Sequence, residues 1–467
     1  MFRRKIEEAV KALQFRDLYL LPSLSSKDPS EIDLTTNFSR NIVLKIPIAS
    51  SPMDTVSEDE MSIALALLGG IGVIHRNNSI EEQIEIIKRV KSAPPVRIRE
   101  AYLYTSDPCH RALEVLEDLE VRDLPVISLE GRIVGMIYYN DLIRSCKEYI
   151  SLEKILRPPR YVNIKNIGEA RKILFEERLD SLAVVNQDLV YIGTIIYRDL
   201  FTDLQPSLDD EGRLLVAAAV SPFDRNRVIK VDRYADAIVT DLAHLHNKNA
   251  IDALRSIQKE VSKDLVLGNI ATYEAVKDLA ENIEKIDGFR VGLGGGSICT
   301  TPEQAGAYVP TLYAVASVRD AVDDLGLRVP VIADGGIRSG ADIVKALAAG
   351  ASVAMLGYLL AGTDEASSPA IRIGSKIYKY YRGMASKSSM ERRFAVDRYS
   401  RRAKRVEEGI EGLVEYKGSV FKVVPELIEA VKAGLGYAGA SNIRDLWEKS
   451  RFLVTTERGD RGLKIEL

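Results

Sequence analysis

The stretch RVGLGGGSICTT, residues 290–301, brings a thiol together with hydroxyls in a glycine-rich loop. Cys299 lies two residues after Ser297 and two before Thr301. The glycines of this loop permit backbone conformations that let main-chain groups approach a ligand or an ion closely. An isolated buried cysteine more often serves only for packing, but a cysteine in a polar loop is a candidate nucleophile. The pattern therefore favours covalent catalysis through Cys299.

Two further loops have the composition of phosphate sites. IADGGIRSG (332–340) places two glycines directly after Asp334, and MLGY (355–358) contains Gly357. Backbone N–H groups at the start of a helix suit an anion. The Asp334 carboxylate could accept both hydroxyls of a ribose, although a cap on the following helix is the simpler alternative.

Eight short apolar runs, several of which end in Gly, Asp or Ser, predict the elements that position these loops. Near-continuous apolar runs are typical of strands buried on both faces of a parallel sheet, and helical patterns lie between many of them. Eight such units predict a (β/α)8 TIM barrel, whose active sites lie at the carboxyl ends of the strands. A doubly wound open sheet is the alternative. The runs occupy residues 46–50, 70–74, 214–220, 237–241, 265–269, 288–293, 329–335 and 352–357.

The gap between the second and third runs is too long for a connection within a barrel and contains an internal repeat. DLPVISLEGRIVGMIYYNDLI is followed later by DSLAVVNQDLVYIGTIIYRDLF. The repeat resembles tandem cystathionine-β-synthase-type (CBS) modules, in which Asp141 or Asp199 could hold the ribose of an adenine nucleotide. The alternative is that each Asp only caps a helix. We therefore predict barrel parts at 1–94 and 206–467 and an inserted pair of CBS modules at 95–205.

Composition limits the classes of partner. The 467-residue chain has a net charge of −3, which gives no reason to expect nucleic acid. Its three cysteines do not indicate a disulfide framework, and the N-terminus lacks the apolar core of a signal peptide. No run approaches the roughly 18 apolar residues of a membrane span. These features predict a cytoplasmic protein with no membrane association.

Motifs along nearly the whole chain resemble those of the inosine-monophosphate (IMP) dehydrogenase/GMP reductase family. They are FRDLYLLP, SSPMDTVSE, GGIGVIHRNNSIEEQ, GLGGGSICTT, IADGGI, KYYRGMAS, EEGIEG and GYAGA. The resemblance implies that Cys299 attacks C2 of the hypoxanthine ring of IMP. Hydride then passes to NAD⁺, and hydrolysis of the thioimidate releases xanthosine monophosphate. The implied nucleotide contacts are Ser51, Met53, Ser297, Asp334, Gly335, Gly336, Gly357, Tyr358, Tyr381, Gly383, Met384 and Glu408.

The resemblance also implies a cofactor site, an ion site and an assembly. The cofactor would contact Asp241, Asn269, Gly292 and Gly294. A potassium ion would bind Gly294, Gly296 and Cys299, together with Glu457 and Gly459 supplied by a neighbouring subunit. A shared ion site implies a homotetramer, and an octamer is the larger alternative.

Hydrolysis needs a group that activates water. By the resemblance, Arg398 and Tyr399 form the catalytic pair of a mobile flap, with Thr301 as an auxiliary hydroxyl. The charged stretch 385–418 that carries them would otherwise be a solvated surface excursion.

Some positions depart from the family pattern. Leu245 stands where a glycine is expected and could narrow the nicotinamide side of the site; Pro302 follows CTT, and Tyr358 replaces a small residue. Two alternatives to the dehydrogenase therefore stay open: an NADPH-dependent GMP reductase, and a nucleotide-binding paralogue with impaired catalysis. The flap motif DRYS followed by EEGIEG favours the dehydrogenase, because reductases lack the hydrolytic Arg-Tyr pair.

Overall fold

The computed structural model of the protein describes residues 9–145, 151–200, 204–391 and 408–454. The chain divides into two compact units, one formed by residues 1–93 and 206–467 and the other by residues 94–205. Each unit is described separately below. No helix among the described residues is long and apolar enough to cross a membrane.

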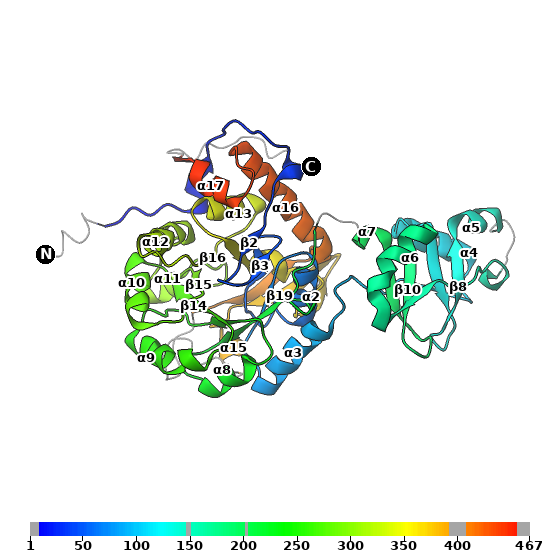
Figure 1. Ribbon diagram of the computed structural model, residues 1–467, viewed down its shortest axis with the longest axis horizontal. Coiled ribbons are helices and arrows are strands. Elements are labelled where there is room, and N and C mark those ends of the chain that lie inside the picture. Colours follow the sequence, from blue (N-terminus) through cyan, green and yellow to red (C-terminus); the bar gives the residue numbers. More distant parts are fainter. Residues whose placement is uncertain (1–8, 146–150, 201–203, 392–407, 455–467) are drawn as a thin grey trace. The chain divides into compact units, whose positions relative to one another are not determined.

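The larger unit is a closed barrel of eight parallel strands (Figure 1). Backbone hydrogen bonds from Ser50 N to Ile71 O (3.1 Å) and from Ile71 N to Ile48 O (3.2 Å) join the first strand to the second. Because these bonds close the ring, the predicted TIM barrel is confirmed and the open sheet is wrong. The strands are β4 (Ile48–Ser50), β5 (Gly72–Ile74), β12 (Val216–Val220), β13 (Ala237–Thr240), β14 (Asp264–Ile270), β15 (Gly288–Val291), β16 (Val331–Asp334) and β17 (Val353–Leu356).

Each strand is followed by a helix that returns along the outside of the barrel, as Figure 1 shows for α8, α9, α10, α12 and α13. Side chains of Ser79, Asp224, Asn247, Thr272 and Ser339 cap five of these helices by accepting backbone N–H groups. Such caps satisfy donors that the first turn leaves unpaired. The helices are α2 (Asp59–Leu67), α3 (Ile80–Ser92), α8 (Arg225–Val231), α9 (Lys248–Ile257), α10 (Tyr273–Asn282), α12 (Thr311–Asp324), α13 (Gly340–Ala348), α14 (Tyr358–Ala361) and α16 (Val420–Tyr437).

The barrel interior is filled by small and branched apolar side chains, among them Ala217, Ala219 and Val239. A hairpin of β2 (Thr36–Asn37) and β3 (Val43–Leu44) adds Phe38 and Leu44 to this core. Near the chain ends, β1 (Leu18–Leu20) pairs with β21 (Phe452–Val454), which follows α17 (Ile443–Lys449). The hairpin thus contributes two fully buried side chains to the apolar core of the barrel.

Between α14 and α16 the chain leaves the barrel pattern. A three-stranded antiparallel sheet forms from β18 (Ala370–Ile373), β19 (Lys376–Arg382) and β20 (Glu411–Glu415), with α15 (Lys387–Glu391) in between. Part of the charged stretch predicted as a flap or a surface excursion is therefore a paired strand. The predicted flap residues Arg398 and Tyr399 lie outside the described residues.

The smaller unit consists of two copies of one pattern. In each copy, the first strand is parallel to the second, the third is antiparallel to the second, and the register shifts before the last residue of the middle strand. The two copies have separate apolar cores. The first comprises β6 (Leu103–Tyr104), α4 (Cys109–Asp118), β7 (Asp123–Ile127), β8 (Ile133–Tyr138) and α5 (Tyr139–Ser145); the second comprises β9 (Tyr161–Asn163), α6 (Ala170–Glu177), β10 (Ser181–Val185), β11 (Tyr191–Ile196) and α7 (Tyr197–Leu200).

Equivalent aspartates of the two copies have equivalent partners. Arg157 binds both carboxylate oxygens of Asp141 at 2.7 and 2.9 Å, and Arg99 binds both oxygens of Asp199 at 2.6 Å each. Each Asp is the third residue of its helix and does not precede the helix as an N-cap does. The simple capping role is therefore wrong, and arginine occupies both carboxylates.

Cys109, the first residue of α4, is disulfide-bonded, whereas Cys299 is a free thiol. The small number of cysteines therefore did not indicate their oxidation state, and it carries no argument about the cellular compartment.

Candidate active site

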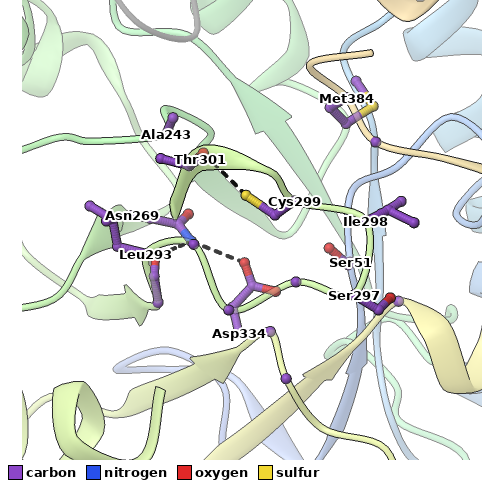
Figure 2. Close-up of a pocket in the computed structure, with 18 of the residues that line it drawn as sticks. Ser51, Ala243, Asn269, Leu293, Ser297, Ile298, Cys299, Thr301, Asp334 and Met384 are labelled. Carbon is purple, nitrogen blue, oxygen red and sulfur yellow. Dashed lines mark hydrogen bonds between the residues drawn. The ribbon is translucent and has the colours of Figure 1, made fainter. Parts of the chain in front are cut away.

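A cavity of about 370 Å³ opens at the carboxyl ends of the barrel strands, as expected for this fold. Loops after β4, β15, β16, β17 and β19 form most of its wall. Figure 2 shows side chains from these loops pointing toward a common space. All of the predicted nucleotide contacts line it: Ser51, Met53, Ser297, Asp334, Gly335, Gly336, Gly357, Tyr358, Tyr381, Gly383, Met384 and Glu408.

Cys299 lies in this cavity beside a hydroxyl and a carboxylate. Its Sγ is 3.2 Å from Thr301 Oγ1, and Thr301 Oγ1 donates a hydrogen bond of 2.8 Å to Glu408 Oε2 (Figure 2 draws the first contact). Backbone bonds hold the three together, since Thr300 N donates to the Glu408 carbonyl. The sulfur is partly exposed and Glu408 is buried. A proton can therefore pass from the region of the sulfur through a hydroxyl to a carboxylate.

The loops after β15, β16 and β17 leave room for a ligand only because they contain glycine. A Cβ at Gly357 would lie 2.9 Å from the Tyr381 hydroxyl and 3.1 Å from Met53 Sδ. Gly336 has a φ of +77°, which other residues rarely adopt. Ser297 Oγ is buried and makes no hydrogen bond to the described residues. An unsatisfied hydroxyl beside glycine-lined loops fits an anionic group such as a phosphate.

Tyr381 also lines the cavity, next to Gly357. Its hydroxyl donates to Met53 Sδ at 3.7 Å, and burial raises the pKa of Tyr381 above its ordinary value. The phenol therefore stays protonated at neutral pH and can donate a hydrogen bond to a bound oxygen.

Asp334, at the end of β16, is clamped through one oxygen only. Arg290 contacts Oδ2 through Nε at 2.9 Å and through NH2 at 2.7 Å, and Asn269 Nδ2 donates to the same oxygen at 3.0 Å. No described residue forms a hydrogen bond or ion pair with Asp334 Oδ1. The Asp334 side chain is 13% exposed, so this second oxygen is available to a ligand. The geometry suits the ribose contact that the sequence predicts.

Asp241 was predicted to contact the cofactor, and the structure places it elsewhere. It is fully buried and does not line the cavity. Its Oδ1 binds Arg290 NH1 at 2.9 Å, while Arg76 approaches Oδ2 at 3.3 Å. A direct contact with a ligand would require Arg290 to move. Arg290 and Asn269 occupy the cavity wall instead.

Comparison with known proteins decides the family. The profile of the IMP dehydrogenase/GMP reductase domain matches residues 12–463. The chain belongs to this family. Its recognition from the sequence motifs is therefore confirmed.

Family members named for either activity are similar over almost the whole chain. An inosine-5′-monophosphate dehydrogenase of Korarchaeum cryptofilum is 43% identical over 97% of this chain and 96% of its own length. One from Thermoplasma acidophilum is 40% identical, covering 99% and 95%. The structure of a Trypanosoma brucei GMP reductase variant in complex with guanosine 5′-monophosphate is 34% identical, with a TM-score of 0.71 and coverage of 97% and 98%.

In this family member the cavity extends from Cys299 toward the segment after β13. That segment contributes Ala243 and His244 to the wall, while Leu245 is fully buried and does not line the cavity. The expectation that Leu245 narrows the nicotinamide side is therefore wrong. Burial, followed by the neighbouring His246, lowers the pKa of His244, so a neutral imidazole faces the cavity.

Of the remaining predicted residues, some line the cavity and others lie outside the described residues. Asn269, Gly292, Gly294 and Gly296 line the cavity with Cys299. Glu457 and Gly459, predicted for the ion site, lie outside the described residues, as do Arg398 and Tyr399.

Sequence reasoning missed the roles of Arg290 and Arg76. Arg290 gave one usable signal: it is a charged residue in the middle of an otherwise apolar strand, GFRV. A buried charge of this kind requires a partner.

Proposed function

We propose that this protein oxidises IMP to xanthosine monophosphate with NAD⁺, a step of guanine nucleotide synthesis. The main support for the proposal is that one cavity contains both a free thiol and groups suited to bind a nucleoside monophosphate. Cys299 lies with its hydroxyl and carboxylate neighbours on one side, and Asp334 offers an open oxygen on another. The relatives that are 40–43% identical carry the name of this dehydrogenase.

In the proposed first step, the Cys299 thiol releases its proton to solvent, and its sulfur forms a bond to C2 of the hypoxanthine ring. The C2–H bond then breaks, and hydride leaves with its electron pair. The product on the enzyme is a thioimidate, in which C2 remains bonded to sulfur. Asp334 would hold the ribose, and the glycine loops with Ser297 and Tyr381 would hold the phosphate, so that C2 stays next to the sulfur.

The polar groups in the part of the cavity near the segment after β13 are suited to bind a nicotinamide nucleotide. Asn269 Oδ1 is buried without a hydrogen bond to the described residues, and neutral His244 and Ala243 face the same space. When bound, NAD⁺ supplies the hydride acceptor. Backbone carbonyls of Gly294, Gly296 and Cys299 are the proposed ligands of a potassium ion, for which oxygen ligands are suitable.

Hydrolysis of the thioimidate restores the thiol. Water adds to C2, the C–S bond breaks, and the sulfur departs with a proton. Thr301 and Glu408 are positioned to take a proton from that water through the hydroxyl. Arg398 and Tyr399 remain the predicted flap pair for the same step.

We further propose that the smaller unit is a tandem CBS pair that binds adenine nucleotides. The repeated strand pattern supports this identity. A ribose at Asp141 or Asp199 would have to displace the arginine that now binds each carboxylate. We also propose that the protein is cytoplasmic and assembles as a homotetramer or an octamer.

The test is absorbance at 340 nm with purified protein, IMP, NAD⁺ and potassium chloride. We expect a rise that yields xanthosine monophosphate and is abolished by Cys299→Ala, which should still bind IMP. Replacing potassium by lithium should reduce the rate. No rise with the folded wild-type protein would contradict the dehydrogenase.

GMP reductase is the second candidate, since solved structures of that enzyme share the fold over nearly the full chain. A reductase would consume NADPH with GMP and release ammonia, and it would need the same cysteine. NADPH oxidation that depends on GMP would establish it. Tight nucleotide binding without turnover in either direction would instead support the impaired paralogue.

A further inference from the structure

Arg290 links two carboxylates that end different strands of the barrel. Its guanidinium lies 2.9 Å from Asp241 Oδ1 and 2.7 Å from Asp334 Oδ2, and only 3% of the residue is exposed. Asp241 follows β13 and Asp334 ends β16, while Arg290 belongs to β15. A planar fork of N–H donors can bind two acceptors in this way, which a lysine cannot reproduce.

The chain of charges continues beyond Asp241. Arg76, which is 1% exposed, donates to the Asp241 carbonyl at 3.0 Å and lies 3.3 Å from its Oδ2. Two arginines and two aspartates therefore alternate, and their formal charges cancel. Burial acts to lower the pKa of Arg290, but the two carboxylates outweigh burial and raise the pKa. Buried charges persist only when paired in this way.

This series of charged side chains ends at Asp334, whose two carboxylate oxygens differ in their partners. Three donor contacts, two from Arg290 and one from Asn269, converge on Asp334 Oδ2, and none from the described residues reaches Oδ1. Such an arrangement fixes the rotation of the carboxylate. One oxygen is held by the protein, and the other is directed to the cavity.

We propose that Arg290 is the positioning residue for ribose recognition, with Asp241 and Arg76 serving to hold Arg290. The inference rests on the proposed nucleotide site. Arg290 acts through Asp334, because it sets which carboxylate oxygen the ribose meets. Two residues, Arg290 and Asp334, stand between Asp241 and the ligand, which explains why Asp241 is fully buried.

The test measures discrimination between a ribose and a deoxyribose without any turnover. Dissociation constants of IMP and 2′-deoxy-IMP are determined by calorimetry in the absence of cofactor. For the wild type we expect IMP to bind about tenfold to hundredfold more tightly, because the deoxyribose lacks one of the two hydroxyl donors to a charged acceptor. The same ratio is measured with GMP and 2′-deoxy-GMP, so the test does not depend on which purine is the substrate.

Arg290→Gln should reduce that ratio to near one, and Arg290→Lys should reduce it partly. The matched control is Arg227→Lys, which alters another buried arginine that pairs with Asp224 outside the cavity. This control should keep the wild-type ratio at a similar change in melting temperature. If Arg290→Gln does not fold, Arg290→Lys decides the matter.

A folded Arg290 variant that keeps the wild-type ratio would overturn the inference and leave the proposed function intact. Wild-type protein that binds neither IMP nor GMP would overturn both. Wild-type protein that binds the nucleotide but does not distinguish ribose from deoxyribose would overturn the ribose role of Asp334, and with it the role of Arg290.

Discussion

The two ends of the barrel each contain a group of ion pairs with limited solvent exposure, and the two groups differ in one respect. At the amino ends of the strands, Lys91 Nζ binds Asp209 at 2.8 Å, Asp236 at 2.8 and 2.9 Å, and the Leu214 carbonyl at 3.0 Å. Backbone and side-chain donors of Arg213 occupy the remaining acceptor positions of Asp209. Every carboxylate oxygen there has a protein partner.

At the carboxyl ends, the charged side chains of Arg76, Asp241, Arg290 and Asp334 are also paired with one another. The exception is one carboxylate oxygen of Asp334. Asp334 Oδ1 has no partner among the described residues, and Asp334 lines the cavity. A closed set of pairs therefore stabilises the fold, whereas one open acceptor marks the place of a ligand. The difference agrees with the general division of this fold into a stabilising amino end and a functional carboxyl end.

The largest expected effect concerns turnover at the carboxyl end. Thr301→Val removes the hydroxyl between Cys299 and Glu408, and the loss of proton transfer should lower kcat by about 10²- to 10⁴-fold. Steady-state kinetics with IMP and NAD⁺ measure it. Thr363→Val, which removes another buried hydroxyl outside the cavity, should leave kcat unchanged. Equal kcat values for the two variants would disprove the relay.

A change at the amino end should affect stability and leave turnover alone. Lys91→Met leaves two aspartates without their shared cation and should destabilise the protein by about 2–4 kcal/mol, somewhat reduced by partial exposure. Thermal unfolding measures it. Lys88→Met, at an exposed pair with Glu85, should have almost no effect. A lower kcat of the folded Lys91→Met variant would contradict the claim that the amino end serves stability and not turnover.

The third prediction concerns affinity. Asp334→Asn should weaken IMP binding by about tenfold to hundredfold, because a neutral amide replaces the charged acceptor of the ribose. Calorimetric titration measures it. Asp236→Asn, at the opposite end, should leave the dissociation constant unchanged. If both substitutions weaken binding equally, the open oxygen is not the ligand contact.

The smallest expected effect is a pH dependence of stability. Burial acts to raise the pKa of Asp209, but hydrogen bonds from Lys91 and Arg213 outweigh it and lower the pKa to about 2, from 3.8. A lowered carboxyl pKa contributes stability that is present above 3.8 and is lost as the pH falls toward 2. The difference in unfolding free energy between wild type and Asp209→Asn should therefore shrink over this range in urea titrations. A constant difference would show that the ionisation of Asp209 is not linked to folding.

Much of the barrel was readable from the sequence, because each strand is buried on both faces. A run such as VAAAV, residues 216–220, has no polar face, and its five residues are all buried. This pattern cannot form an ordinary surface helix or a half-exposed strand. The candidate site followed from the same reading, since loops after parallel strands meet at one end of a barrel.

Local sequence could not show which side chains turn toward the cavity. Asp241 and Leu245 both follow β13, where a ligand contact was expected, yet both are fully buried. Their orientation depends on neighbours that are distant in sequence: Arg76 and Arg290 bind Asp241, and the backbone of Leu245 bonds to Asn269. No window of residues around 241–245 contains that information.

The eight-strand barrel, the glycine loops and the thiol among them could be predicted from the sequence, because periodicity, backbone freedom and reactivity are properties of short segments. The contacts of Arg290 with two carboxylates, and the open oxygen of Asp334, became evident only in the folded protein. Those features arise where three strands, separated by dozens of residues, come into contact. Electrostatic pairing depends on distance in space and not on position in the chain.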